Sequence, residues 1–103
     1  MTNKEIAQNI LTQLGGNRLI AMTGAKNFVA IDRGLQFDLP KKAHFVKNGI
    51  TRLHIVLDAS DTYTIKAFKI RGMNVTEVSE SSMIYCDVLQ ATFTELTGLD
   101  THL

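Results

Sequence analysis

The sequence predicts an α+β domain, in which an antiparallel β-sheet of about five to six strands is flanked by an N-terminal and a C-terminal helix. Apolar residues recur at helical spacing near both ends of the chain, and short apolar runs rich in β-branched residues lie between them. No connection between those runs reads as a helical crossover, so the strands are expected to be antiparallel, with both helices on one face. A chain of 103 residues, 45% of them hydrophobic, fits a single domain over residues 1–103.

The first helix is expected over residues 3–14. Residues Thr2 to Glu5 have the form of a capping box, in which the Thr2 hydroxyl and the Glu5 carboxylate bind free amides at a helix start. Gly15 and Gly16 supply the left-handed conformation that ends many helices. The apolar face of this helix consists of Ile6, Ile10, Leu11 and Leu14.

From Arg18 onward the pattern predicts strands. Asp32-Arg33-Gly34 fits a three-residue hairpin loop in which glycine takes the positive-φ position. The apolar pairs that this loop creates are Ile31 with Leu35 and Val29 with Phe37. Residues 40–49 are expected to form a polar loop carrying Phe45, which separates this hairpin from the next one.

A second hairpin is predicted with Ala59-Ser60-Asp61 as its loop. This loop places apolar residues opposite one another, whereas a two-residue loop would set them against Thr62, Thr64 and Lys66. After Ala67 the apolar alternation slips by one residue, which indicates a β-bulge. The predicted pairs are Leu57 with Tyr63, Ile55 with Ile65 and Leu53 with Ala67.

The remainder of the chain predicts a short strand at residues 75–78 and a second helix. Ser81 or Ser82 is the expected N-cap, and Gly98 is expected to end the helix. Its apolar positions are Tyr85, Val88, Leu89, Phe93 and Leu96.

Gly24-Ala25-Lys26 raises the question of a phosphate-binding loop. Such loops need a following helix, whose N-terminal amides hold the anion, but the next residues read as a strand. We therefore interpret Gly24 as the residue of a turn.

The charges are separated along the chain, although the net charge is only +1. Residues 26–71 hold nine Lys or Arg and four Asp or Glu, a net charge of +5, while residues 72–103 hold five acidic residues and no Lys or Arg, a net charge of −5. Opposite charges on one small protein permit self-association as well as contact with a protein partner. The expected protein-contact residues are Asp87, Glu95 and Asp100.

The residue types argue against an enzyme, a metal site and a cofactor. Cys86 is the only cysteine, so neither an internal disulfide nor a cysteine-based zinc site is available. It reads as a packed side chain in a helix, not as a nucleophile, because no base partner is identifiable. The three histidines show no ligand spacing. We find neither a signal peptide nor a membrane span, and expect a cytoplasmic protein.

One surface has chemical character: the face of the second hairpin that carries cations and an aromatic ring. Such a face suits single-stranded nucleic acid, whose phosphates meet the charges and whose bases stack on the ring. The same residues also fit an ordinary solvated sheet face on which a helix or the Phe45 loop covers Phe68, and we favour this interpretation because no RNA-binding motif accompanies them. The candidate nucleic-acid residues are Arg52, His54, Lys66, Phe68, Lys69 and Arg71.

Three stretches, TGAKNFVA (Thr23–Ala30), DTYTIKAFKIRG (Asp61–Gly72) and FTELTGLDTHL (Phe93–Leu103), resemble small bacteriophage, prophage and mobile-element proteins without an assigned activity. The resemblance runs through most of the chain and transfers no catalytic or binding residue. It implies a phage-encoded protein in a bacterial cytoplasm, where small non-catalytic proteins commonly occupy a host or phage macromolecule, including host-defence machinery. We therefore expect a non-enzymatic protein-binding function, with single-stranded nucleic-acid binding as the alternative.

Overall fold

The computed structural model describes residues 2–39 and 50–97 and confirms the α+β prediction. Five strands form one antiparallel sheet in the order β1-β2-β3-β4-β5, with the predicted N-terminal and C-terminal helices and an additional short helix, α2, before the sheet. The elements are α1 (Asn3–Gln13), α2 (Asn17–Thr23), β1 (Lys26–Ile31), β2 (Gly34–Asp38), β3 (Arg52–Leu57), β4 (Tyr63–Arg71), β5 (Asn74–Ile84), the 3-10 turn η2 (Cys86–Val88) and α3 (Leu89–Thr97).

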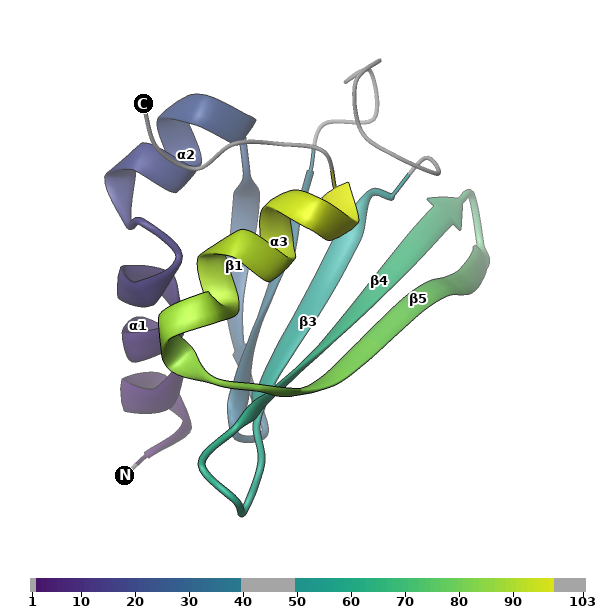
Figure 1. Cartoon of the computed structure of the whole chain (residues 1–103). Helices are drawn as coiled ribbons and strands as arrows, with labels where there is room; N and C mark the ends of the chain where they lie inside the picture. Colours follow the sequence, from purple (N-terminus) through teal and green to yellow (C-terminus); the bar gives the residue numbers. More distant parts are fainter. Residues whose placement is uncertain (1, 40–49, 98–103) are drawn as a thin grey trace.

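The helices α1 and α3 pack on the same face of the sheet (Figure 1). Helix α1 lies against β1 and β2, and α3 lies against β4 and β5. The core between the layers centres on Phe37, whose ring lies 5.4 Å from that of Phe28 and 6.1 Å from that of Phe93, measured between centroids. None of the helices in the described residues is long and apolar enough to span a membrane.

Helix α1 begins as its sequence predicts. The Thr2 hydroxyl accepts a hydrogen bond from the Glu5 amide at 3.1 Å, and the Glu5 carboxylate accepts one from the Thr2 amide at 3.3 Å. Ile6, Ile10 and Leu14 are buried against the sheet. The capping box therefore fixes where the chain enters the fold, and the apolar stripe fixes which face of the helix is covered.

The helix α2 corrects the expectation that strands begin at Arg18. Glycines with positive φ stand at both of its ends, Gly16 at 56° and Gly24 at 72°. Leu19 and Thr23, one turn apart, are both buried, and the Thr23 hydroxyl donates to the Leu19 carbonyl oxygen at 2.6 Å. A short apolar run does not distinguish a buried helix from a strand. Because β1 follows Gly24 directly, this glycine ends a helix and bends the chain, in agreement with the turn interpretation.

The register predicted for the first hairpin is wrong by one residue. The loop contains only Asp32 and Arg33, and Arg33 rather than Gly34 has positive φ, at 54°. Gly34 is needed for another reason, since a Cβ at this position would lie 2.3 Å from the backbone oxygen of Ile55 on β3. The observed pairs are Ile31 with Gly34, Ala30 with Leu35 and Val29 with Gln36.

A register shift in β1 completes this correction. The β1–β2 pairing slips between Lys26 and Val29, and Asn27 there adopts a positive φ of 58°. As a result Phe28 packs against the core, while Val29 is 49% exposed.

The second hairpin forms with the predicted register. The Asp58 amide donates to the Thr62 carbonyl at 2.8 Å, which leaves three residues in the loop, and Asp61 takes the left-handed position with φ of 61°. A register shift occurs at the predicted place, between Ala67 and Phe68, but the extra residue is Val78 of β5, and Phe68 keeps its regular pairing with Arg52 instead of moving to the apolar face. The observed pairs are Leu57 with Tyr63, Ile55 with Ile65 and Leu53 with Ala67.

The last strand is longer than predicted and the last helix begins later. Ser81 and Ser82 lie inside β5 instead of capping a helix. This strand is polar along most of its length, so alternation does not reveal it. Leu89 and Phe93 are buried as expected, whereas Tyr85 and Val88 are exposed. The Phe45 loop and Gly98 lie outside the described residues, and so does the side chain of Leu96.

Replacing Gly34 with alanine should destabilise the domain. The new Cβ would meet the backbone of both Ile55 and Val56, at 2.3 Å and 3.0 Å, so β2 and β3 would have to separate. We expect a loss of about 2–3 kcal/mol in the free energy of unfolding, measured in urea. The control is Gly72→Asn at a positive φ of 57° with no atom within 4 Å, where asparagine is tolerated. A Gly34→Ala variant as stable as the control would show that the strands separate easily.

Candidate functional site

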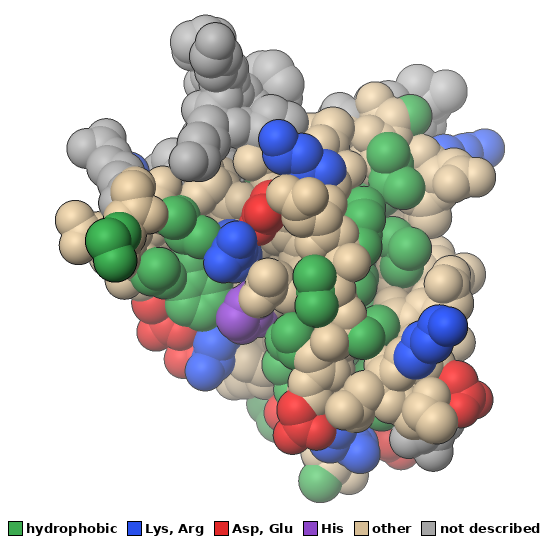
Figure 2. Space-filling view, turned by 180° about the vertical axis from the view of Figure 1, so that it is seen from behind, with side chains coloured by type: hydrophobic (Ala, Val, Ile, Leu, Met, Phe, Trp, Pro, Cys, Tyr) green, Lys and Arg blue, Asp and Glu red, His purple; other side chains and the backbone are tan. Residues whose placement is uncertain are grey.

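Four of the predicted nucleic-acid residues meet on the face of the sheet that turns away from α1 and α3. Arg52 pairs with Phe68 and His54 pairs with Lys66, as the predicted register requires. Figure 2, which shows the molecule from behind, places the histidine among hydrophobic, cationic and acidic side chains. Lys69 follows Phe68 on β4, so its side chain points to the opposite face of the strand. Arg71 ends β4, and its side chain lies outside the described residues.

The cations on this face have acidic neighbours. The Arg52 guanidinium lies 2.7 Å from the Asp38 carboxylate, which also accepts a hydrogen bond from Asn27 at 3.1 Å. The Arg52 hydrogen bond is the main cause that lowers the pKa of Asp38 below its ordinary value. On the β5 side, Lys66 stands opposite Glu80 and Phe68 stands opposite Glu77. The face therefore carries mixed charge, which weakens its attraction for phosphate.

His54 contributes no fixed positive charge to this face. Its Nε2 atom lies 2.8 Å from the Gln36 side-chain oxygen, and its ring lies 4.7 Å from the Phe68 ring between centroids. Burial lowers the pKa of His54 below its ordinary value, and the nearby charges of Arg52 and Lys66 lower it further. Phe68 itself is half-buried. The His54 ring therefore covers part of the Phe68 ring, which the sequence predicted as a surface for stacking bases.

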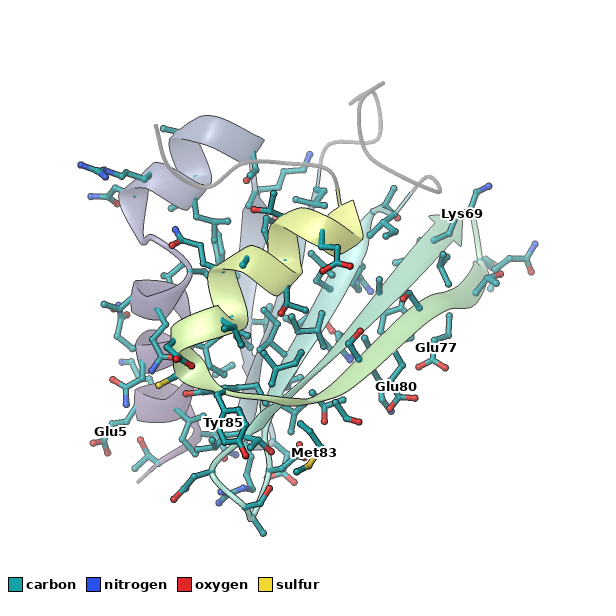
Figure 3. All side chains as sticks on the ribbon, in the orientation of Figure 1. Glu5, Lys69, Glu77, Glu80, Met83 and Tyr85 are labelled. Atoms are coloured by element: carbon teal, nitrogen blue, oxygen red, sulfur yellow. The ribbon has the colours of Figure 1, made fainter. Side chains whose placement is uncertain are left out.

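A second surface lies where β5 leaves the sheet, and the sequence interpretation missed it. Met83, Tyr85 and Val88 are 62%, 60% and 44% exposed, and we call these three residues the exit cluster. Figure 3 shows Met83 and Tyr85 near the end of β5, beside the β3–β4 loop. The Thr62 hydroxyl approaches the Met83 sulfur at 3.9 Å, which ties the cluster to that loop.

Met83 has an unusual backbone conformation. Its φ is +57°, a region that residues other than Gly, Asn and Asp rarely adopt. This angle accompanies a register shift between β5 and β4, between Tyr63 and Ile65. The sequence offered one signal, a methionine within a polar run, but the N-cap assigned to Ser81 or Ser82 placed this segment in a helix. Strained exposed residues of this kind often belong to functional surfaces.

A cavity of about 220 Å³ opens beside the exit cluster. Gln13 carries a side-chain oxygen that is buried and has no hydrogen-bond partner. Cys86 is exposed at the cavity, in the turn η2 and not in a regular helix. The lining residues are Ile6, Asn9 and Gln13 of α1, Leu57, Asp61 and Tyr63 of the β3–β4 hairpin, and Cys86.

The predicted protein-contact residues fall in different places. Asp87 is exposed in η2, where it follows Cys86 of the cavity lining and precedes Val88 of the exit cluster. Glu95 is exposed on α3, and Asp100 lies outside the described residues. Within residues 2–39 and 50–97, no three His, Cys, Asp or Glu side chains come close enough to hold a metal ion.

The environment of His54 can be tested by titration. We expect a pKa below the ordinary value of about 6.5, measured from its imidazole signals by NMR. Phe68→Ala should raise this pKa by exposing the ring, and Lys66→Gln should raise it less by removing a cation. Because the folded state binds this proton more weakly than the unfolded state, stability should fall as the pH drops through this range. A His54 pKa at or above the ordinary value would contradict the burial assigned to it.

Comparison with protein-family models, with curated proteins and with solved structures finds no match to this chain. The function is therefore inferred from the chain's own side chains, and two surfaces enter that inference. One is the mixed-charge face around His54, and the other is the exit cluster with its cavity.

Proposed function

We propose that this chain is a non-enzymatic binding protein that contacts a partner protein through the exit cluster. The observation that carries the proposal is the exposure of Met83, Tyr85 and Val88, of which Met83 and Tyr85 lie near the end of β5 (Figure 3) and Val88 donates its amide to the Tyr85 carbonyl at 3.0 Å. Aromatic and methionine side chains are enriched at protein interfaces, and these three residues leave 44% to 62% of their surface for a partner to cover. If the phage resemblance holds, the partner is a host or phage macromolecule, with host-defence machinery as one class.

The conformation of Met83 supports this proposal. A left-handed residue with a Cβ costs about 1–2 kcal/mol relative to the usual conformation, and asparagine or glycine would reduce that cost. Met83 instead combines this backbone with a side chain that is mostly in solvent. Folding of the isolated chain gains little from such an arrangement, whereas binding gains a large apolar side chain held in a defined direction.

Charge favours a partner of a different kind over a second copy of this chain. Asp87 precedes Val88 of the exit cluster in the chain, Asp61 lines the neighbouring cavity, and both are exposed. The segment from residue 72 to residue 103 contains no Lys or Arg. A two-fold dimer through this surface would bring like charges together. A partner with a cationic rim around an apolar centre would complement it.

The alternative, binding of single-stranded nucleic acid by the Arg52, His54, Lys66 and Phe68 face, has weaker support. Asp38, Glu77 and Glu80 lie beside the cations, and His54 is neutral near pH 7 because its pKa is lowered. Binding through so few free cations would show a shallow dependence on salt concentration. We do not propose an enzyme, because the hydroxyl–carboxylate contacts in the described residues, Thr2 with Glu5 and Thr64 with Asp58, lie outside the cavity.

The exit cluster can be tested with the double variant Met83→Asn and Tyr85→Ser. Asparagine tolerates the positive φ of Met83, so the variant should fold as well as the original chain. Proteins captured from a bacterial lysate would be identified and purified, and their affinity measured by titration calorimetry. We expect binding at least about 30-fold weaker, as for the loss of an interface hot spot.

The control is the double variant Val29→Ser and Val75→Ser. These valines are also exposed, at 49% and 61%, but lie on the outer strands away from the exit cluster. The control should bind like the original chain. Equal losses in both variants, or a homodimer that only the exit-cluster variant dissolves, would overturn the proposal of a separate protein partner.

A further inference from the structure

We infer that the cavity beside the exit cluster receives the guanidinium of an arginine side chain from the partner. This inference rests on the proposed function and deepens it, because it assigns a chemical group to one point of the contact. The cavity is formed where α1, the β3–β4 hairpin and the turn η2 meet. Its lining combines oxygen acceptors with apolar walls.

The first observation is the Gln13 side-chain oxygen, which is buried and lacks a hydrogen-bond partner. Leaving a buried acceptor unpaired costs about 1–3 kcal/mol, so native proteins rarely keep one without a ligand, an ion or water. Gln13 lines the cavity, but this oxygen is not itself accessible from it, so a donor that enters reaches the oxygen once the terminal amide turns toward the cavity. An arginine offers five N–H donors and no acceptor.

The second observation is Asp61 of the β3–β4 loop, which is exposed and lines the same cavity as Gln13 of α1. Its backbone is held in the loop by a hydrogen bond from its amide to the Asp58 carbonyl at 3.0 Å. A carboxylate on a fixed loop favours a cation over a neutral donor, and its two oxygens match the planar guanidinium. Asn9 and Tyr63 also line the cavity.

The size and the walls of the cavity also fit. A volume of about 220 Å³ leaves room for more than a single water. The methylene stem of an arginine that enters it would lie against Ile6 and Leu57. Cys86 connects the cavity to its chain neighbours Tyr85 and Asp87, so one partner segment could occupy the cavity and cover the exit cluster.

The probe for this inference is N-acetyl-L-arginine amide, titrated into the 103-residue chain and followed by backbone amide NMR shifts. The matched ligands are the amides of N-acetyl-citrulline, which has nearly the same shape without the charge, and of N-acetyl-lysine. A lone side chain buries few atoms, so a dissociation constant of about 10 mM is expected for arginine. The shifts should centre on Gln13, Asp61, Tyr63 and Cys86. Citrulline and lysine should bind at least about tenfold more weakly.

Two variants complete the test. Asp61→Asn keeps a residue that tolerates the left-handed loop position and removes the charge, so arginine should bind about tenfold more weakly. Asp32→Asn makes the same change in the loop of the other hairpin and should have no effect. Equal binding of citrulline or lysine, shifts centred elsewhere, or unchanged binding in Asp61→Asn would each overturn the inference.

The outcome is separable from that of the proposed function. If the exit-cluster variant loses the partner while arginine amide shows no binding, the protein contact stands and the arginine pocket is wrong. If arginine amide binds as described while the exit-cluster variant keeps the partner, the pocket stands and the proposed contact surface is wrong.

Discussion

The strict alternation of side chains along β3 is the constraint on which the rest of this structure depends. Leu53, Ile55 and Leu57 are buried beneath the helices, while Arg52, His54 and Val56 point to the other face and are half-buried. Because β3 is the central strand, its alternation is imposed on β2 and β4 through their direct pairing. A shift of one residue would bury a cation and a histidine in the core. Both the position of the core and the composition of the opposite face follow from this single strand.

Register shifts then decide how the outer strands depart from that alternation. Glu77 and Glu80 are three residues apart, so in a regular strand they would point to opposite faces. The shift opposite Ala67 and Phe68 places them both on the His54 face, where they stand across from Phe68 and Lys66. In β1 the shift turns Phe28 toward Phe37 and leaves Val29 exposed. The presence of both glutamates on the outer face is thus a consequence of the bulge in the β4–β5 pairing, whereas Asp38 stands beside Arg52 independently of it.

The sequence allowed prediction of those elements whose information is local. The capping box at Thr2 and Glu5, and the loop and pairs of the second hairpin, depend on residues close together in the chain. The register of the first hairpin depends on the approach of Gly34 to Ile55, which is 21 positions away in the chain. The sequence between β2 and β3 does not indicate how these two strands pair. For the same reason the contact between Asp38 and Arg52 was not predicted. The run after Arg18 is apolar enough for either a helix or a strand, and only burial of Leu19 and Thr23 decides between them.

Of the two candidate surfaces, the sequence also predicted only the one that depends on local information. The four residues on one face of the second hairpin were predicted together, because they are set by its local register. The exit cluster was not predicted, because β5 is polar along most of its length and Tyr85 and Val88 also fit a helical stripe. Periodicity reports which side chains can be buried together. It does not report that a tyrosine and a methionine remain exposed where a strand ends, since that depends on where the following helix begins.

The edges of the sheet are consistent with the recognition surface that we propose at its end. An open edge strand offers unpaired backbone groups to any extended chain, which is a hazard as well as an opportunity. Here both outer strands are interrupted by register shifts, one in β1 and two in β5. Lys26 adds a charge to β1, and Glu77 and Glu80 add charges to β5. These features oppose the addition of another strand. What the described surface offers a partner is then a set of side chains held by α1, the β3–β4 loop and η2 together, and a site built from three elements discriminates by shape and charge where a bare edge would not.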